Sequence, residues 1–498
     1  MDLLKFKSGS DIRGTAAEGV ENQPIELTDE RVDRMAKGFF VWLKKRNPDK
    51  SRLTISLGHD SRISAPRLSA CVKKALVESG ADVIFTGLSS TPAMFMTTQL
   101  LGCDGAIQLT ASHHPFNKNG LKFFSPKGGL EGSDITEILT YANENVREEG
   151  NGSVKEVDFM TTYSKVLVDF VRRETGEVRP LEGFKIVVDA GNGAGGFYVD
   201  NVLAPLGANT DGSQFLEPDG YFPNHIPNPE NPTAMKSICD KVKEVKADFG
   251  IIFDTDVDRA GAVDDLGEEI NRNKLIALIS AILLEEKSGA YIVTDSITSD
   301  GLKEFIEAKG GVHHRFKRGY KNVINEALKL NAEGKYCPLA IETSGHAALK
   351  ENYFLDDGAY LVTRLLVKIA KLKGTGKKLR DLISDLKMPV ESSEVRMGFI
   401  DGVDFKSYGK KVLDDLKDYA EKSGWTIAPS NYEGIRISFP QGEGNGWFLL
   451  RMSLHDPIMP LNVESNDVGG NLVIAKKLYA FLSNYPDLVL DNLKKFIG

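Results

Sequence analysis

Three segments of the chain repeat one theme, an apolar strand that runs directly into a polar loop rich in Asp, Gly or Ser. They are Leu57 to Arg62, Val188 to Gly196 and Val293 to Gly301. In the N-terminal part of the chain such strands alternate with helical patterns, which is typical of an α/β fold with a largely parallel sheet. The repetition predicts three similar α/β domains with mixed sheets.

The first of these domains shows the alternation most clearly. Its apolar spacing predicts helices over 28–45 and 65–79 and strands over 53–57, 82–85 and 105–109. After the last strand, the residues from Phe116 to Lys122 have turn chemistry that ends in a cation. A polar, Gly-containing stretch over 143–158 follows and predicts a domain boundary.

The C-terminal part has a different pattern. Gly434 to Phe439 and Gly446 to Arg451 read as neighbouring antiparallel strands with a glycine-rich turn between them. A helix over 470–483 is expected to end the chain, so this part is predicted to be an α+β domain. The predicted domains are residues 1–160, 161–268, 269–388 and 389–498.

The bulk composition excludes several classes of partner. The 498 residues exceed a single core, and 62 Lys and Arg against 70 Asp and Glu give a net charge of −8. This balance argues against nucleic acid or an anionic membrane as the main partner. The four cysteines form no Cys-x-x-Cys pair, and the N-terminus has no signal-peptide core. A cytoplasmic protein is expected.

A serine lies on the loop that leaves the strand over 105–109. The stretch is Thr110-Ala111-Ser112-His113-His114-Pro115, in which the proline disfavours helical geometry at His114. A serine on such a loop is expected to be exposed, rigidly held and next to proton acceptors, as a nucleophile requires. An isolated Ser–His pair is more often part of an ordinary turn.

Three aspartates alternate along the loop after a second buried strand. Asp254, Asp256 and Asp258 are two residues apart, so their carboxylates can converge on one side. Close carboxylates repel unless a cation neutralises them, and hard oxygen ligands suit Mg²⁺ or Ca²⁺. An EF-hand does not fit, because Arg259 and Asp265 occupy positions that need Gly and Glu. A solvated acidic turn is the alternative, which the preceding buried strand disfavours.

Four further stretches give weaker signals. Gly191 to Gly196 resembles a dinucleotide-binding glycine pattern, but tight strand-to-helix packing explains these glycines more simply. Glu342 and Ser344, on an extended loop, can bind vicinal hydroxyls of a sugar. Lys321 supplies a cation beside a glycine, although a charged helix start would look the same. The Arg451 to Pro457 stretch offers an Arg fork and a hydroxyl for phosphate, or an ordinary turn after a strand.

The stretch around Ser112 closely resembles the Thr-Ala-Ser-His-Asn-Pro phosphoserine loop of the α-D-phosphohexomutase family (phosphomannomutase/phosphoglucomutase type), with His114 in place of Asn. Four other segments, in the family's order, extend the resemblance over nearly the whole chain. They are Ser10 to Gly14, similar to Asp-Gly-Ile-Arg-Gly; the Asp-x-Asp-x-Asp-Arg segment; Glu342 to His346, similar to Glu-Met-Ser-Gly-His; and the phosphate loop. That last loop is usually Arg-Pro-Ser-Gly-Thr-Glu-Pro and agrees only at Arg451, Ser453 and Pro457, while Leu454 and His455 replace the glycine and the threonine.

The resemblance implies four domains around a central cleft and a role for each loop. Catalytic roles are implied for Ser112, Lys122, Arg13, Arg259 and His346. Substrate binding is implied for Glu342, Ser344, Lys321, Arg451, Ser453 and His455. One Mg²⁺ is expected on Ser112, Asp254, Asp256 and Asp258.

The implied reaction interconverts hexose 1-phosphate and hexose 6-phosphate of glucose or mannose, through a phosphoserine and a bisphosphorylated sugar. Glucose or mannose 1,6-bisphosphate is the expected activator, and a monomer or dimer is expected. Lys122 or His346 is the expected general acid or base, and the sequence does not separate them.

Three alternatives stay open from the sequence. A phosphoglucosamine mutase would share the same loops, and a non-catalytic sugar-phosphate sensor is motivated by the altered phosphate loop. The segment from Ile252 to Val257 also looks like the Asp-x-Asp nucleophile of haloacid dehalogenases, which would make Asp254 the phosphorylated residue.

Overall fold

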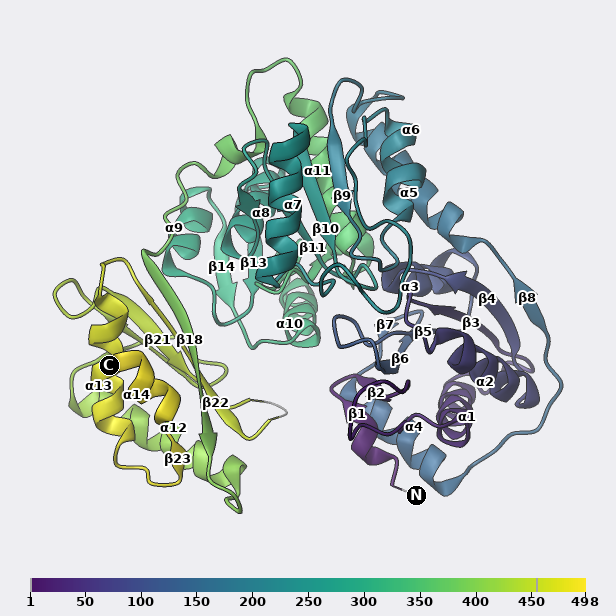
Figure 1. Ribbon diagram of the computed structural model, residues 1–498, viewed down its shortest axis with the longest axis horizontal. Coiled ribbons are helices and arrows are strands. Elements are labelled where there is room, and N and C mark those ends of the chain that lie inside the picture. Colours follow the sequence, from purple (N-terminus) through teal and green to yellow (C-terminus); the bar gives the residue numbers. More distant parts are fainter. Residues whose placement is uncertain (1, 454–455) are drawn as a thin grey trace. The chain divides into compact units, whose positions relative to one another are not determined.

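The computed structural model describes residues 2–453 and 456–498 and forms two compact units (Figure 1). The first unit consists of Met1–Ile279 and Ser344–Leu382, and the second consists of Ser280–Thr343 and Ile383–Gly498. The unit boundaries therefore pass through helix α8 (Asn273–Glu286) and again just after Thr343. Among the described residues no helix is both long and apolar enough to cross a membrane.

The N-terminal sheet has a parallel centre and antiparallel strands at one side. Its strand order is β1-β2-β6-β5-β3-β4-β8, with β7 paired to β6. The strands are β1 (Lys7–Ser8), β2 (Asp11–Thr15), β3 (Thr54–His59), β4 (Asp82–Leu88), β5 (Gly105–Leu109), β6 (Lys118–Ser125), β7 (Gly128–Gly129) and β8 (Val154–Glu156). The helices are α1 (Asp29–Arg46), α2 (Ala65–Glu78), α3 (Thr91–Leu100) and α4 (Gly132–Glu144). The predicted strands and helices over 28–109 are thus confirmed to within three residues.

Helix α1 shows how the sequence determines where a helix begins and which face it packs on this sheet. Thr28 caps the helix by accepting a hydrogen bond from the amide of Arg31, and Val32, Met35 and Phe39 lie on its buried face. The Phe39 ring stacks on Phe123 of β6 at 4.7 Å between centroids. The apolar face of α1 is therefore buried against the sheet, as the helical spacing predicts.

The predicted turn over 116–122 is wrong from Lys118 onward, because β6 begins there. An Asn-Gly pair usually signals a turn, but here it lies inside the strand. A Cβ on Gly120 would sit 2.2 Å from the carbonyl oxygen of Ile12, so this glycine allows β2 and β6 to approach closely. Lys122 is consequently on a strand, opposite Asp11 in the register.

A second, smaller mixed sheet carries the loop of aspartates. Its order is β12-β11-β10-β9, with β9 (Ile186–Asp189) and β10 (Phe249–Phe253) parallel and β11 (Ala260–Val263) and β12 (Glu269–Ile270) antiparallel. A Cβ on Gly193 would lie 2.6 Å from the carbonyl oxygen of Thr255. Close packing of the loop after β9 against the loop after β10 therefore explains this glycine, rather than the predicted packing of a strand against a helix.

The first unit also contains further helices, several of them labelled beside β9 and β10 in Figure 1, and one more pair of strands. They are helices α5 (Phe159–Thr175), α6 (Ala204–Leu206), α7 (Pro232–Val245) and α11 (Gly358–Leu372), and the antiparallel strands β16 (Ala347–Leu349) and β17 (Leu355–Asp356). Helix α11 packs on α5 and on β11. A Cβ on Gly358, the first residue of α11, would lie 2.5 Å from the carbonyl carbon of Arg259, so this helix begins directly against the aspartate loop.

The second unit combines a parallel sheet with an antiparallel one. Strands β13 (Tyr291–Thr294), β14 (Val312–Arg315) and β15 (Leu339–Ile341) are parallel and alternate with α9 (Asp300–Ala308) and α10 (Tyr320–Ala332). The antiparallel sheet has the order β19-β20-β21-β22-β18-β23. Its strands are β18 (Glu391–Phe399), β19 (Thr426–Ile427), β20 (Ile435–Phe439), β21 (Gly446–Leu450), β22 (Ile458–Ser465) and β23 (Leu488–Val489).

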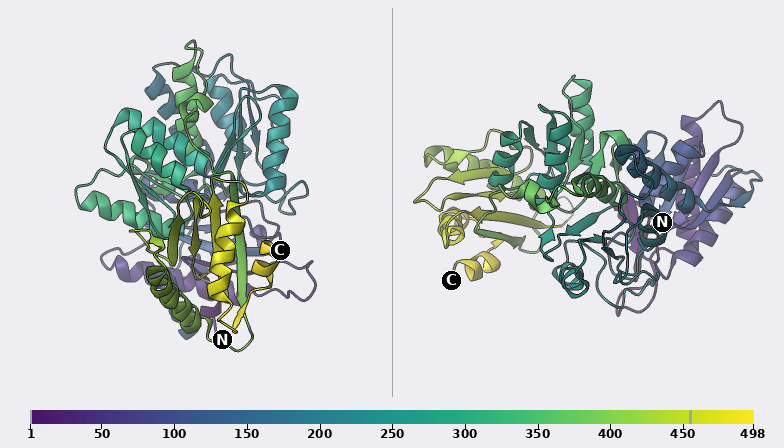
Figure 2. Two further views of the ribbon diagram at one scale, coloured as in Figure 1. Left: turned by 90° about the vertical axis from the view of Figure 1, so that its left-hand side faces the viewer. Right: turned by 90° about the horizontal axis from the view of Figure 1, so that it is seen from above.

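Helices α12 (Phe405–Lys422) and α13 (Gly470–Leu482) pack on the antiparallel sheet (Figure 2). The predicted antiparallel pair, β20 and β21, is confirmed. The helix expected to end the chain does not, because β23 and α14 (Asp491–Ile497) follow α13. A helix of seven residues has too few turns to show apolar periodicity, and it depends on tertiary packing, here through the buried Leu493. The predicted fold class, α/β domains with mixed sheets and a C-terminal α+β domain, is confirmed.

Candidate active site

Ser112 lies on the loop that leaves β5 and is buried, with 5% of its surface exposed. The expectation of an exposed serine is therefore wrong, and the reason is the folding of this loop onto the loop after β10. The Ser112 hydroxyl donates to Asp254 Oδ2 at 3.1 Å and accepts from Arg259 Nη2 at 2.7 Å. Its backbone has a φ of +50°, a left-handed conformation that is costly for a residue with a side chain.

The three aspartates converge as their spacing predicts. Each of Asp254, Asp256 and Asp258 offers a carboxylate oxygen, and these oxygens lie within 4.8 Å of one another. All three are buried. Between them Val257 takes a φ of +66°, which is rare for a β-branched residue, and the turn is closed by the amide of Arg259 donating to Asp254. The loop thus holds strain that keeps three carboxylates together.

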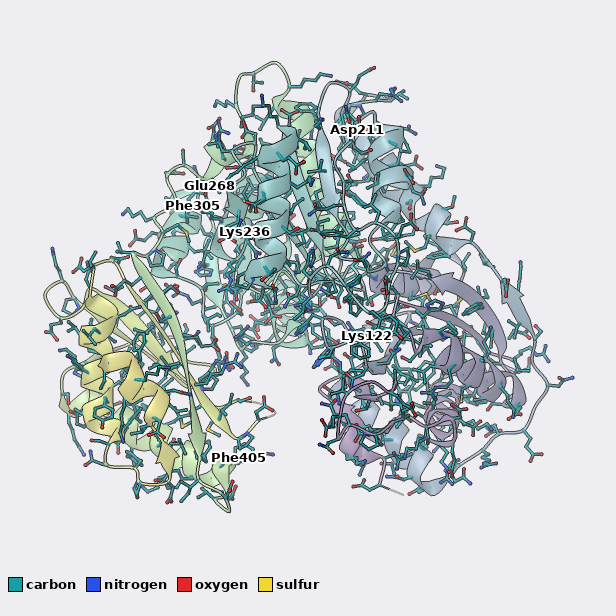
Figure 3. All side chains as sticks on the ribbon, viewed as in Figure 1. Lys122, Asp211, Lys236, Glu268, Phe305 and Phe405 are labelled. Carbon is teal, nitrogen blue, oxygen red and sulfur yellow. The ribbon has the colours of Figure 1, made fainter. Side chains whose placement is uncertain are left out.

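Two buried cations partly neutralise this cluster. Lys122 Nζ lies 2.6 Å from Asp258 Oδ2, and Arg259 Nε lies 3.1 Å from Asp254 Oδ2 (Figure 3 labels Lys122). Burial raises the pKa of Asp254, and the neighbouring Asp258 raises it further. Burial acts in the same direction on Asp258, but Lys122 and its other positive neighbours hold the pKa of that carboxyl well below its ordinary range.

The cluster fits a divalent cation. Asp256 Oδ1 and Asp258 Oδ1 are buried and accept no hydrogen bond from any described residue. Asp256 is held from its other side by Thr91, the first residue of α3, whose hydroxyl donates to Oδ2 and whose amide donates to the Asp256 carbonyl. Oriented, unpartnered carboxylate oxygens are the donors that a hard cation such as Mg²⁺ prefers.

His113 lies beside Ser112 and is neutral at pH 7. Burial, followed by the positive charge of Arg259, lowers the pKa of His113 to about 2. Its Nδ1 is 2.6 Å from Arg259 Nη2 and 3.3 Å from Ser112 Oγ. Because the guanidinium can only donate, Nδ1 accepts this hydrogen bond. His113 therefore helps to orient Arg259.

His346 lies beside Asp258, just before β16. Its Nε2 is 3.8 Å from Asp258 Oδ1, and its Nδ1 is 2.9 Å from Ser344 Oγ. Burial lowers the pKa of His346 to about 3, although Asp258 opposes this shift. The imidazole is therefore neutral at pH 7 and can accept a proton. The first unit thus brings His346 and Ser344 close to Asp258.

Arg13 reaches the serine loop from β2. Its Nη2 lies 3.0 Å from Asp11 Oδ2, and its Nη1 lies 3.0 Å from Nε2 of His114. One quarter of the side chain is exposed, which leaves part of the guanidinium open to an anion. Arg13 is therefore placed beside the serine loop by a strand.

The second unit carries all of the residues predicted to bind sugar and phosphate except Ser344, which lies in the first unit. Glu342 follows β15 and accepts from the amide of Gly319 at 2.6 Å, and Lys321 lies in the first turn of α10. Glu342 is buried, and its carboxylate holds Gly319, the residue that caps the start of α10.

The phosphate loop follows β21 in the same unit. Arg451 is largely buried, and burial followed by the positive charge of Arg318 lowers its pKa. Ser453 donates its amide to the Ile458 carbonyl at 3.0 Å. His455 and Leu454 lie outside the described residues, so the prediction for His455 stays untested.

Sequence reasoning missed two contributors to the first unit's site. Thr91 begins a helix whose capping serine and proline are evident in the sequence, but nothing local connects it to an aspartate 165 positions away. Arg62 follows β3 and contacts the serine loop through its guanidinium group. An arginine two residues after an aspartate, in the loop that follows a strand, is a weak signal in itself.

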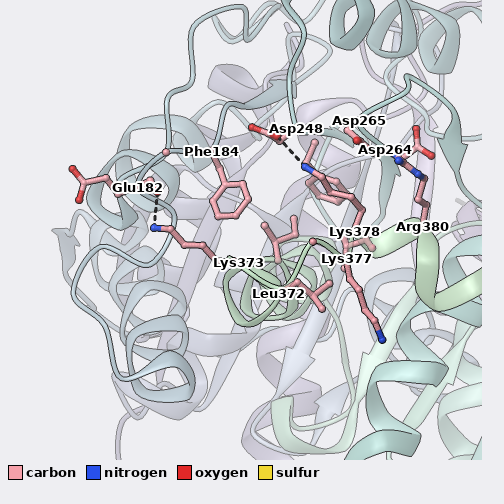
Figure 4. Close-up of a pocket in the computed structure, with 16 residues that line it drawn as sticks. Glu182, Phe184, Asp248, Asp264, Asp265, Leu372, Lys373, Lys377, Lys378 and Arg380 are labelled. Atoms are coloured by element: carbon pink, nitrogen blue, oxygen red, sulfur yellow. Dashed lines mark hydrogen bonds and ion pairs between the residues drawn. The ribbon is translucent and has the colours of Figure 1, made fainter.

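A separate cavity of about 440 Å³ lies near the amino-terminal ends of β9 and β10 (Figure 4). Phe184 and Leu372 contribute to its apolar lining, and its rim carries paired charges, with Lys378 Nζ 3.4 Å from Asp248. The aspartates follow the opposite end of β10, about 17 Å away at the usual rise of a strand. The cavity contains none of the predicted site residues.

Comparison with known proteins gives one consistent result. Models of phosphoglucomutase/phosphomannomutase alpha/beta/alpha domains I, II and III match residues 5–149, 162–267 and 271–388. A phosphomannomutase/phosphoglucomutase of Pseudomonas putida is 31% identical over 83% of this chain and 83% of its own length. A phosphoglucomutase/phosphomannomutase of Thermococcus kodakarensis is 30% identical over 90% of this chain and 92% of its own length.

A solved structure supports the same assignment. A phosphoglucomutase/phosphomannomutase family protein from Burkholderia thailandensis matches with a TM-score of 0.79 and 26% identity, over 97% of this chain and 98% of that one. The matching domains cover most of the sequence and include the serine loop and the aspartate loop. The chain therefore belongs to the phosphoglucomutase/phosphomannomutase family and is a mutase enzyme.

Proposed function

We propose that this mutase interconverts hexose 1-phosphates and hexose 6-phosphates, of glucose, mannose or both, with Ser112 as the phosphoryl carrier. One observation carries the proposal: the Ser112 hydroxyl is within hydrogen-bond distance of both Asp254 and Arg259, inside a buried cluster of carboxylates. The names of the relatives support the two hexoses.

The reaction begins with phosphorylated Ser112. The bond from Oγ to phosphorus breaks while a bond forms between phosphorus and a free hydroxyl oxygen of the hexose monophosphate. The proton of that hydroxyl leaves to a base and is returned to Oγ, so the product is a hexose bisphosphate and free serine. After the sugar turns round, the other phosphate passes to Ser112 by the reverse step.

The charged residues around Ser112 supply most of the stabilisation. Phosphoryl transfer depends on positioning and on neutralising oxygen charge. Arg259 donates toward the transferring group, and Arg13 faces it from β2. His346 and Lys122 are assigned to proton transfer, because His346 Nε2 and Lys122 Nζ both lie beside the Asp258 carboxylate, at 3.8 and 2.6 Å.

The metal is proposed to be Mg²⁺, held by the three aspartates and by the phosphate on Ser112. It supplies positive charge to the phosphoryl oxygens. Glucose or mannose 1,6-bisphosphate is the proposed activator, since it regenerates phosphoserine from free Ser112. In the second unit, Glu342 is assigned to sugar hydroxyls, and Lys321, Arg451 and Ser453 to the phosphate that does not react.

The geometry favours Ser112 over Asp254 as the phosphorylated residue. Asp254 Oδ1 accepts from the Arg259 amide, and Asp254 Oδ2 accepts from Ser112 and from the Arg259 side chain. Both carboxylate oxygens of Asp254 thus hold Ser112 and Arg259 in place, which is the role of a positioning group rather than of a nucleophile. A phosphoserine ester is stable to acid, unlike an acyl phosphate.

The test is Ser112→Ala, measured with intact-mass analysis and a coupled assay on glucose, mannose and glucosamine phosphates. The wild-type protein is expected to carry one acid-stable phosphate on a fraction of molecules, mapped to Ser112. The variant is expected to lose this phosphate and all mutase activity. Normal turnover by the Ser112→Ala variant would refute Ser112 as the phosphoryl carrier. Turnover of glucosamine phosphate alone by the wild-type protein would show that it is a phosphoglucosamine mutase.

A further inference from the structure

Arg62 is one of the most deeply buried charged side chains in the first unit, with 1% of its surface exposed. It lies just after β3, and a guanidinium carries five N–H donors. All five are used: Nε donates to Asp60 Oδ2 at 3.2 Å, and Nη1 and Nη2 each donate to two backbone carbonyls.

All four carbonyls belong to one loop. They are those of Ser112 and His114, bonded by Nη2, and those of Pro115 and Lys118, bonded by Nη1. The loop from 112 to 118 therefore wraps around a single planar group. A lysine has three donors on one point charge and cannot bind four diverging carbonyls.

This arrangement matters because the loop is strained. Ser112 has a φ of +50°, and such a conformation persists only where the surroundings over-determine it. The contact of Arg62 with the Ser112 carbonyl acts on the same residue whose hydroxyl reaches Asp254. A rotation of that peptide would turn Oγ away from Asp254.

The segment that contains Gly220 and Phe222 shields the hydrogen bonds between Arg62 and the loop carbonyls from water. The Phe222 ring lies 5.3 Å from the guanidinium carbon of Arg62, and a Cβ on Gly220 would lie 2.4 Å from the amide nitrogen of Ile63. The segment that contains Gly220 and Phe222 therefore packs directly on the chain around Arg62. The hydrogen bonds to the carbonyls do not compete with solvent.

We propose that Arg62 is a positioning residue for phosphoryl transfer, which holds the 112–118 loop so that the Ser112 hydroxyl is aimed at Asp254 and Arg259. The inference rests on the proposed function, because it takes Ser112 as the phosphoryl carrier. Arg62 does not touch the reacting atoms and acts only through the loop.

The first experiment compares Arg62→Lys with Arg67→Lys. Arg67 is a matched control, since its Nη2 also donates to two backbone carbonyls, of Ala16 and Leu27, at 2.8 and 3.0 Å. Phosphorylated enzyme is mixed with glucose 1-phosphate in a rapid-quench instrument, and loss of phosphate from the protein is followed. A misplacement of about 1 Å costs roughly 100-fold in rate.

Arg62→Lys is therefore expected to slow transfer and kcat by about 100-fold, while KM changes by less than threefold. Arg67→Lys is expected to lower the melting temperature but to keep kcat within twofold of wild type. A folded Arg62→Lys enzyme with wild-type kcat would overturn the proposal. So would equal losses of kcat in both variants, since these would indicate a general loss of stability.

A second variant keeps the test independent of how lysine packs. Arg62→Gly is assayed with added guanidinium or methylammonium chloride at millimolar concentrations, both with wild-type controls. Guanidinium, with its planar donors, is expected to restore activity at least tenfold, and methylammonium to restore none. Equal effects of the two salts would contradict the proposal. Ser112→Ala separates the proposed function from the proposed role of Arg62. If Ser112→Ala is active, Ser112 is not the phosphoryl carrier. If Ser112→Ala is inactive while Arg62→Lys is normal, only the role of Arg62 is wrong.

Discussion

Replacing Lys122 with methionine tests how the buried aspartates are held together. Lys122 Nζ lies 2.6 Å from Asp258 Oδ2, and the two side chains are 8% and 2% exposed. Methionine keeps most of the volume and removes the charge. Asp258 then loses its main cation in a cluster where burial and mutual repulsion already raise the pKa of Asp254 and Asp256.

Breaking a buried ion pair by removing one partner costs about 3–5 kcal/mol. In a unit of this size, 1 kcal/mol moves the melting temperature by about 2 °C. We therefore expect Lys122→Met to lower the melting temperature of the metal-free protein by roughly 6–10 °C. Added Mg²⁺ is expected to restore part of this loss, because it replaces the missing positive charge.

The assay is differential scanning calorimetry in EDTA and in Mg²⁺, on Lys122→Met, Asp258→Asn and the double variant. The double variant is expected to lose at least 2 kcal/mol less than the sum of the single ones, since each single change strands the other partner. Lys127→Met, on an exposed turn nearby, serves as the control and is expected to change stability by less than about 0.5 kcal/mol. A shift below 2 °C in EDTA, or additive losses, would refute the reasoning.

Three further predictions follow from the same geometry. Asp256→Asn is expected to raise the Mg²⁺ concentration needed for half-maximal activity at least tenfold, measured after EDTA treatment; an unchanged metal dependence would count against the cluster. Glu342→Ala is expected to lower kcat/KM by about 10- to 150-fold, because a hydrogen bond to a charged group contributes about 1.5–3 kcal/mol. Unchanged kinetics with a lower melting temperature would make Glu342 structural. Burial raises the pKa of Glu464 from 4.5 to about 7, so the folded state holds a proton that the unfolded state releases, and stability is lost as pH rises between these values. Glu464→Gln is expected to raise the melting temperature by several degrees at pH 8 and not at pH 4.5; equal shifts at both values would contradict this.

The sequence predicts elements well where local pattern decides them. β5 has the predicted bounds, since it is a short apolar strand bounded by polar or glycine-containing loops. The convergence of the three aspartates also follows from spacing alone. The turn predicted at Asn119-Gly120 is wrong because the sequence does not distinguish a glycine that allows two strands to approach closely from a glycine that allows a turn.

The environment of Ser112 could not be predicted from its own loop. Its burial depends on Asp254 and Arg259, which lie more than 140 positions later in the chain. The contributions of Thr91 and Arg62 could not be predicted either. Thr91 contacts a carboxylate that is distant in the sequence, and Arg62 contacts backbone carbonyls. A motif identifies the chemistry of its side chains, whereas tertiary contacts determine their solvent exposure and their orientation.

The charges of the first unit's site explain why so many ionised groups are buried together. With all three aspartates ionised, as a bound cation would keep them, their charges and those of Lys122 and Arg259 sum to −1. A bound divalent cation would bring this sum to +1, and a phosphate on Ser112, at about −2, would return it to about −1. Every state of the proposed cycle is thus within about one charge of neutral, which limits the cost of desolvation at each step. Loss of Lys122 would move the metal-free site to −2, so the instability expected of Lys122→Met and the need for a divalent cation have the same origin.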